Sequence, residues 1–329
     1  MDEQGLGKGP ISDARLLAGG TQNLLLRFER DGRAYVLRRP PVHLRKNSNE
    51  TMRREARVLA ALAESDVPHP RLIAGCGDET VIGAAFYLME PIEGFNPTTG
   101  LLPYHQSDPA IRRRMGFALV EGISALGKVD YLSAGLEGFG KPEGYLDRQV
   151  GRWQSQLDSY AEFEGWSGPG EIVGVDKVAR WLTDHTPKSF KPGIIHGDYH
   201  LSNVMYEPQS PELAAIVDWE LSTIGDPLLD LGWLMATWPG EEGGGPGSVG
   251  VTPWDGFPKI EELIAHYAER TDRDMDAIAW YGVLACYKLG IILEGSHARA
   301  SAGKAPKEIG DRLHATTLGL FDRALKMMA

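Results

Sequence analysis

Cysteine is scarce in this sequence. Only Cys76 and Cys286 occur among its 329 residues, one in a Gly-Cys-Gly turn and the other in an apolar run with helical spacing. Two cysteines this far apart form neither a disulfide framework nor the paired spacing of a zinc site. The sequence therefore predicts two free thiols, as is usual in a reducing compartment.

Long apolar runs are also missing. We find no stretch that approaches the roughly 20 apolar residues needed to span a bilayer. The N-terminal segment MDEQGLGKGP is polar and lacks the apolar core of a secretory signal. We therefore expect a cytoplasmic protein without a membrane partner.

Basic residues are outnumbered, with 34 Lys and Arg against 45 Asp and Glu. Residues 1–95 hold 13 of each sign, so the whole net charge of -11 arises in residues 96–329. An acidic second part disfavours a nucleic-acid partner. It mildly suits a cationic ligand, although an acidic surface that serves solubility is the simpler explanation.

The first part of the chain predicts a small antiparallel sheet with one main helix. Two strands are expected in residues 24–38 on either side of Asp31-Gly32, because Asp-Gly favours a two-residue hairpin turn. Apolar residues recur at helical spacing in residues 49–64. The apolar strand of residues 86–94 runs into a Pro- and Gly-containing connector, so we place an N-terminal lobe in residues 1–93.

The remaining residues, 94–329, are predicted to form a larger and mostly helical C-terminal lobe. A strand-like island in residues 193–217 interrupts the helical pattern. Residues 239–258 are rich in Gly and Pro and are expected to form a mobile loop. Apolar spacing predicts helices in residues 110–128, 145–163, 175–185, 261–269, 276–294 and 309–328.

The most informative segment is IIHGDYHLSNVMY at residues 194–206. Its His196, Asp198 and Asn203 have the H-x-D-x-x-x-x-N spacing of kinase catalytic loops. Asp198 is then predicted to accept or orient the attacking hydroxyl in phosphoryl transfer. His196 is more simply explained as a residue that braces the loop.

A hairpin is expected directly after this loop. Strands at residues 204–206 and 213–217, joined by a turn, would bring Asn203 beside Asp218. Amide and carboxylate oxygens are the ligands that Mg²⁺ prefers, so Asn203 and Asp218 are predicted to hold the metal on the nucleotide phosphates. The nearby Asp226 and Asp230 are better explained as a helix cap and as hydrogen-bond acceptors that hold the catalytic loop.

The N-terminal lobe supplies candidates for the nucleotide. Gly19 and Gly20 precede a strand and allow close approach of the backbone to phosphate, with Thr21, Gln22 and Asn23 as nearby donors. These residues are predicted to contact the phosphates.

Two further groups complete the predicted nucleotide site. Arg38 ends a strand where kinases place a phosphate-contacting lysine, and Glu55 lies on the apolar helix face, where an acid needs a partner. Arg38 is the natural partner, with a surface pairing as the alternative. Met89, Glu90 and Ile92 form the connector whose backbone would face adenine.

Taken in order, these motifs resemble one known family. The segments GGTQN, YVLRRPP, REARVL, FYLME, HGDYHLSN, IVDWE and GDPLLDLG are similar to the aminoglycoside phosphotransferase and choline kinase-like family over about residues 10–325. The closest likeness is to the branch with kinase-like domains fused to acyl-CoA dehydrogenases. The resemblance implies an α+β, protein kinase-like two-lobed fold, ATP or GTP with Mg²⁺, Asp198 as base, and Asn203 and Asp218 as metal ligands.

The sequence departs from relatives at two motifs. Arg38 stands where many of them have lysine, and the planar guanidinium is not equivalent to an ammonium group. Asp-Trp-Glu at residues 218–220 replaces Asp-Phe-Gly, and no Ala-Pro-Glu follows, which disfavours a protein kinase.

We therefore predict an ATP-dependent phosphotransferase, acting as a monomer or homodimer on a hydroxyl of a small molecule. The acceptor is either aminoglycoside-like or a hydroxy acid or hydroxyacyl-CoA, bound by the helical lobe. A nucleotide-binding module without turnover is the alternative. A metal-dependent hydrolase would need more clustered ligands than His196, Asp198 and His200 provide.

Overall fold

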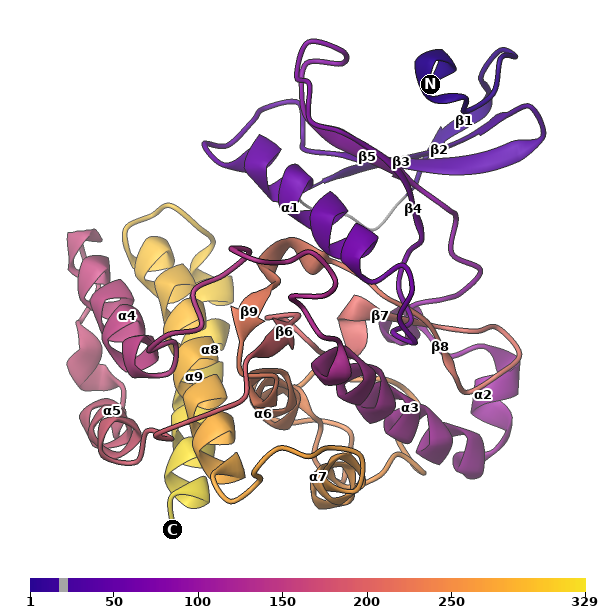
Figure 1. The fold of residues 1–329 in the computed structure, drawn as a ribbon. Helices are drawn as coiled ribbons and strands as arrows, with labels where there is room; N and C mark the ends of the chain where they lie inside the picture. Colours follow the sequence, from indigo (N-terminus) through magenta and orange to yellow (C-terminus); the bar gives the residue numbers. More distant parts are fainter. Residues whose placement is uncertain (18–22) are drawn as a thin grey trace.

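The computed structural model describes residues 1–17 and 23–329 and has two parts stacked on one another (Figure 1). The first part is a five-stranded antiparallel sheet in the order β1-β2-β3-β5-β4, with one long helix packed against β4 and β5. Its elements are β1 (Ser12–Leu16), β2 (Leu24–Arg30), β3 (Arg33–Arg39), α1 (Ser48–Ala61), β4 (Leu72–Cys76) and β5 (Phe86–Met89), after a 3-10 turn at Asp2–Gln4. The predicted α+β, two-lobed kinase-like fold is confirmed.

The turn between β2 and β3 follows from its two residues. Asp31 and Gly32 both have positive φ, 50° and 73°, as a hairpin turn of the primed type requires. The strands pair in register from Leu24 with Arg39 to Arg30 with Arg33. This register carries Arg38 to the end of the hairpin that faces the helical part.

The chain leaves the sheet through a tight crossing. The Phe95 amide and carbonyl both pair with Tyr206 at 2.9 Å, so the residue after the connector already belongs to the second part. At Gly94 a Cβ atom would lie 2.9 Å from both Ala214 Cβ and the Tyr206 carbonyl oxygen, so glycine is required by space. The division at residues 93 and 94 stays a prediction that agrees with this crossing.

The second part is helical, with two small antiparallel sheets at its junction with the first part (Figure 1). Strand β6 pairs with β9, and β7 pairs with β8. The helices are α2 (Pro103–Ser107), α3 (Pro109–Lys128), α4 (Asp147–Asp158), α5 (Val175–Asp184), α6 (Leu228–Thr237), α7 (Ile260–Ala268), α8 (Ile278–Ser301) and α9 (Lys307–Met327), and the strands are β6 (Gly193–Ile195), β7 (Val204–Tyr206), β8 (Leu213–Ile216) and β9 (Thr223–Gly225).

Helix α8 is the centre of this part. It packs on α9, α6, α4 and α5, and residues such as Trp280, Val283 and Ile291 are fully buried. By length and composition alone α8 could cross a membrane, which corrects our expectation that no stretch would qualify. However, 67% of its apolar window is buried inside the fold, as expected for a core helix.

Several features differ from the sequence-based expectation, including the unpredicted α2 and β9. Strands β1 and β4 were not predicted, because β1 has the exposed sequence SDARL and β4 contains Gly75. The expected mobile loop, residues 239–258, packs on the helical part, with Val251 and Phe257 buried and the Trp254 ring stacked 4.4 Å from that of Phe257.

Candidate active site

The β7–β8 hairpin brings the two predicted metal ligands together. Val204 pairs with Ile216, and the Val217 amide donates to the Asn203 carbonyl oxygen over 2.9 Å. Asp218 follows in the left-handed backbone region, at φ 66°, with 41% of its side chain exposed. Aspartate in this region is uncommon and is concentrated at functional sites, so the fold holds Asp218 in a defined orientation beside Asn203.

Asp198 is fixed by three side chains. Asn203 Nδ2 donates to Asp198 Oδ2 over 3.0 Å, and Trp233 Nε1 donates to Oδ1 over 2.8 Å. His200 Nε2 lies 3.2 Å from the same Oδ1. Burial opposes the charge of this carboxylate, but the His200 hydrogen bond and the charges of His200, His196 and Lys288 lower the pKa of Asp198 to about 2. Asp198 is therefore ionised at neutral pH.

Asp230 of α6 holds the predicted catalytic loop in place. Its buried carboxylate accepts from the backbone amides of His196 and Gly197 over 2.7 and 2.8 Å. His196 Nε2 donates to the Val217 carbonyl oxygen over 2.9 Å, which ties the loop to the end of β8. The predicted structural roles of His196 and Asp230 are confirmed.

Asp226 likewise has a structural role. Its Oδ1 accepts from the Leu228 amide at the start of α6, and its Oδ2 accepts from the Tyr281 hydroxyl. The helix itself begins at Leu228 with Pro227 as its N-cap, one residue later than the expected Asp226 cap.

The predicted ion pair between Arg38 and Glu55 is present and has a third member. Arg38 Nε lies 2.8 Å from Glu55 Oε2, and Arg38 Nη2 lies 2.7 Å from Asp218 Oδ1. The Tyr87 hydroxyl donates to Glu55 Oε2 over 2.8 Å. Burial alone would lower the pKa of Arg38, but Glu55 and Asp218 together raise it above its usual value. Arg38 therefore joins α1 to the metal-ligand position across the two lobes.

The structure describes some, but not all, of the other residues that were predicted to bind the nucleotide. Gly20 and Thr21 lie outside the described residues. The Asn23 side chain forms a hydrogen bond with Glu220. Met89 is buried, Ile92 is partly buried, and the Glu90 amide donates to the Arg71 carbonyl oxygen over 2.9 Å. The Glu90 amide is therefore not available to adenine as the expected connector site would require, because the residue before β4 already accepts from it.

A cavity of about 530 Å³ opens at Gly197, next to Asp198, between the helical part and Arg54 of α1. Gly197, Trp233 and Lys288 line it next to the catalytic loop, and Tyr145, Trp153 and Tyr281 form much of its wall. Three segments of the helical lobe, residues 145–160, 233–254 and 281–297, each contribute to it, in agreement with the expectation that this lobe binds the acceptor. The cavity is thus where a hydroxyl could approach Asp198.

Three cations line this cavity: Arg54, Arg152 and Lys288. Arg54 is held over the Phe139 ring and donates to the carbonyl oxygens of Phe139 and Ser222. Across the described ranges 1–17 and 23–329, Arg152 and Lys288 form no ion pair within 4.0 Å. Two acids line the wall, Glu220 and Asp230. Asp230 already accepts from two backbone amides, so Glu220 is the remaining acid that could balance these cations.

Lys288 links the cavity to the loop that carries Asp198. Its Nζ lies 4.1 Å from the centre of the Trp233 ring and donates to the Gly197 carbonyl oxygen over 3.2 Å. Burial lowers the pKa of Lys288 to about 8, although Asp198 and Asp230 act in the opposite direction. A buried ammonium group without a carboxylate in contact is costly. It is well suited to an anionic group of a ligand.

Sequence reasoning did not connect Trp233 or His200 with Asp198, and it did not single out Lys288. Lys288 had a visible signal, since it is a lone cation within the apolar run of α8. Trp233 had none, because aromatic residues in a buried helix are usually core.

The fold and this arrangement of carboxylates are consistent with the phosphotransferase enzyme family. Residues 13–281 match the model of the phosphotransferase enzyme family, and the chain belongs to this family. Its catalytic-loop and hairpin residues lie within the matched range.

Solved structures agree with this assignment. A Ralstonia eutropha protein described as a candidate aminoglycoside phosphotransferase shares 31% identity and a TM-score of 0.78, over 97% of this chain and 94% of that one. An aminoglycoside phosphotransferase in complex with GDP and kanamycin has a TM-score of 0.64 at 16% identity, over 96% of this chain and 94% of that one, and shows the common fold.

Curated relatives carry a further domain. Acyl-CoA dehydrogenase family member 11 from Gallus gallus is 30% identical over 95% of this chain, and the Homo sapiens protein of the same description is 32% identical over 88%. The chain spans 40% and 36% of these two proteins. The predicted branch of the family, kinase-like domains fused to acyl-CoA dehydrogenases, is confirmed.

Proposed function

We propose that this chain transfers the γ-phosphoryl group of ATP, with GTP as a possible second donor, to a hydroxyl group of a small molecule. The observation that carries the proposal is the hydrogen bond from Asn203 to Asp198, beside the hairpin that ends at Asp218 and next to the cavity lined by Gly197 and Trp233. In this role Asp198 orients the hydroxyl and accepts its proton. Its low pKa fits orientation better than strong proton abstraction, which suits the loose transition state of phosphoryl transfer.

The donor set fits a magnesium–nucleotide complex. Asn203 uses its amide nitrogen to bind Asp198, which leaves its amide oxygen as a ligand for a hard cation. Burial and the negative charges of Asp218 and Asp198 raise the pKa of Glu220, and a divalent cation would relieve this repulsion. When bound, Mg²⁺ would neutralise charge that develops on the phosphates.

Arg38 lies where it could assist nucleotide binding, although many relatives have lysine at this position. Its Nε is buried close to Glu55 without the alignment of a hydrogen bond and has no other hydrogen-bond partner among the described residues. The guanidinium charge therefore lies beside Asp218, where it would attract the nucleotide phosphates while Nη2 keeps Asp218 in place. Adenine would bond to the Glu90 carbonyl and Ile92 backbone, since the Glu90 amide is occupied.

The cavity favours a hydroxy acid or its CoA ester over an aminoglycoside. A polycationic acceptor would meet Arg54, Arg152 and Lys288, whereas a carboxylate or phosphate would pair with them. The acidic second part of the sequence suggested the opposite, but charges spread over the surface act weakly compared with the cations of the cavity wall. Relatives that carry an acyl-CoA dehydrogenase domain support an acyl-type acceptor.

The test combines nucleotide binding with turnover. We expect Mg²⁺-dependent thermal stabilisation by ATP, lost in Asp218→Asn, together with ADP release on addition of hydroxy acids or hydroxyacyl-CoA esters. Stabilisation without ADP release, across those acceptors and aminoglycosides, would favour the nucleotide-binding module without turnover. Absence of any nucleotide-dependent shift would remove the proposal.

A further inference from the structure

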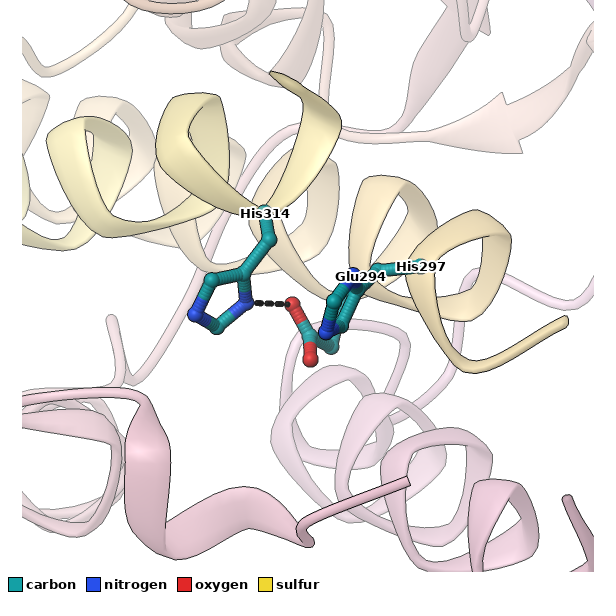
Figure 2. Close-up of side chains that lie close together, drawn as sticks. All are labelled: Glu294, His297 and His314. Carbon is teal, nitrogen blue, oxygen red and sulfur yellow. Dashed lines mark hydrogen bonds and ion pairs between the residues drawn. The ribbon is translucent and has the colours of Figure 1, made fainter. Parts of the chain in front are cut away.

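A second cluster of titratable side chains lies away from the phosphotransfer site. Glu294 and His297 stand one helical turn apart on α8, and His314 faces them from α9 (Figure 2). One ligand atom from each, a carboxylate oxygen or a ring nitrogen, lies within 4.8 Å of the other two. None of these residues lines the cavity beside Asp198 or contacts the catalytic loop.

Glu294 is the buried centre of the cluster. Its side chain has 0% exposure, with Oε1 accepting from Trp166 Nε1 and Oε2 accepting from His314 Nδ1, both over 2.8 Å. No lysine or arginine in residues 1–17 or 23–329 forms an ion pair with it. A carboxylate taken out of water needs a positive charge in contact, and only an imidazolium or a bound cation can supply one here.

The two histidines favour the bound cation. Their rings stack with centroids 4.5 Å apart and an angle of 28° between planes, so two imidazolium ions would repel each other. His297 Nδ1 is buried and makes no hydrogen bond within the described chain, with Asp311 Oδ1 3.9 Å away. A neutral imidazole with a buried, unpartnered nitrogen is the state in which histidine binds metals.

We propose that Glu294, His297 and His314 bind one Zn²⁺ or a similar divalent transition metal. Zinc bonds of about 2.0–2.2 Å place tetrahedral ligand atoms roughly 3.4 Å apart, within the spread of these three side chains. His314 binds through Nδ1 once its ring proton moves to Nε2. Two imidazoles disfavour Mg²⁺ and Ca²⁺, which take oxygen ligands. Asp311 or water completes the coordination.

The role of this metal is structural. It joins α8 to α9 next to the turn that connects them, and Trp166 holds the second oxygen of Glu294 as an outer-shell partner. Lys288 lies on the same helix, so the clamp would steady the wall of the acceptor cavity. The inference stands independently of the proposed phosphotransfer.

The test is metal binding by the purified full chain after removal of metals with a chelator. We expect one equivalent of Zn²⁺ in competition with a chromophoric chelator, and Co²⁺ to give a visible spectrum of nitrogen and oxygen ligation. His297→Gln and His314→Gln should each weaken Zn²⁺ binding by at least about tenfold, and Trp166→Phe should weaken it by about tenfold.

A matched control is present in the chain. His266 and Glu121 form a similar pair, 2.8 Å apart, so His266→Gln should leave Zn²⁺ binding unchanged. Asp218→Asn should also retain it. Less than one equivalent in the wild type, or binding that is lost in Asp218→Asn and kept in the histidine variants, would overturn the proposal. The Co²⁺ spectrum of the wild type decides the case if a variant does not fold.

Discussion

The two sides of the active site use cations in opposite ways. On the nucleotide side, the buried Arg38 contacts Glu55 and Asp218 at 2.8 and 2.7 Å. On the acceptor side, Lys288 contacts a ring face and a carbonyl oxygen but no carboxylate within 4.0 Å among the residues described. The first cation has its charge balanced by the protein, and the second lacks a balancing partner.

This difference indicates a separate role for each cation. A balanced cation mainly fixes geometry, and here it holds Asp218 and α1 in register across the lobes. An unbalanced cation beside a cavity reduces folding stability and is retained where a ligand supplies the missing charge. Removal of Glu55 would leave the Arg38 charge less balanced, and removal of Lys288 would eliminate the unbalanced charge.

The largest effect is expected for the residue between the two sides. Asp198→Asn keeps the side-chain volume but removes the charge that orients the hydroxyl, so turnover should fall by about 10²- to 10⁴-fold. ATP binding should change little, as measured by calorimetry with Mg²⁺. The exposed Asp184→Asn serves as control, and unchanged turnover in Asp198→Asn would reject the role of Asp198.

The next effect breaks the balance around Arg38. Glu55→Ala leaves a buried guanidinium with Asp218 as its one remaining acid, so the free energy of unfolding should fall by about 3–5 kcal/mol in urea denaturation. Glu50→Ala, on the same helix but 64% exposed, should change it by less than about 1 kcal/mol. Equal losses in the two variants would show that the buried pair has no special weight.

Removal of Lys288, the unbalanced cation, should affect acceptor binding and not lower the stability. Lys288→Met should keep or increase stability, because the new side chain can pack on Trp233 without a buried charge. The KM for a hydroxy acid should rise by about tenfold or more, since a charge-assisted hydrogen bond is lost. Lys177→Met, on the surface of α5, is the control, and an unchanged KM in Lys288→Met would place the acceptor anion elsewhere.

The smallest effect concerns pH. With a pKa lowered to about 8, Lys288 is charged below pH 8 and neutral above it, so kcat/KM for an anionic acceptor should fall as pH rises above 8. Asp198, with a pKa of about 2, stays ionised between pH 5 and 9 and adds no inflection. The same profile in Lys288→Met should lack the fall, and its persistence would assign the inflection to another group.

Local patterns predicted much of the fold and the placement of Asp198 beside Asn203. Asp198, Asn203 and Asp218 lie within one loop and hairpin, so their spacing in the sequence fixes their spacing in the structure. The Arg38–Glu55 pair was also predictable, since an acid on the apolar face of α1 needed a partner at a strand end.

The acceptor cavity was not predictable in the same way. Its cations come from α1, α4 and α8, and their meeting depends on how helices far apart in sequence pack. Net charge does not describe this cavity, because it counts exposed surface residues equally with the three cations of the cavity wall. Strand β1 was missed because its exposed residues show no alternation of apolar and polar positions.

The most direct test of the account is phosphoryl transfer to acceptors that differ only in charge. Wild-type protein with γ-labelled ATP and Mg²⁺ would be given a panel of hydroxy acids, the corresponding methyl esters, and aminoglycosides. We predict label on the acids, with the neutral esters at least about tenfold less efficient because they cannot pair with Lys288. Equal labelling of acids and esters, preferential labelling of aminoglycosides, or no labelled acceptor while ATP is bound would contradict the account.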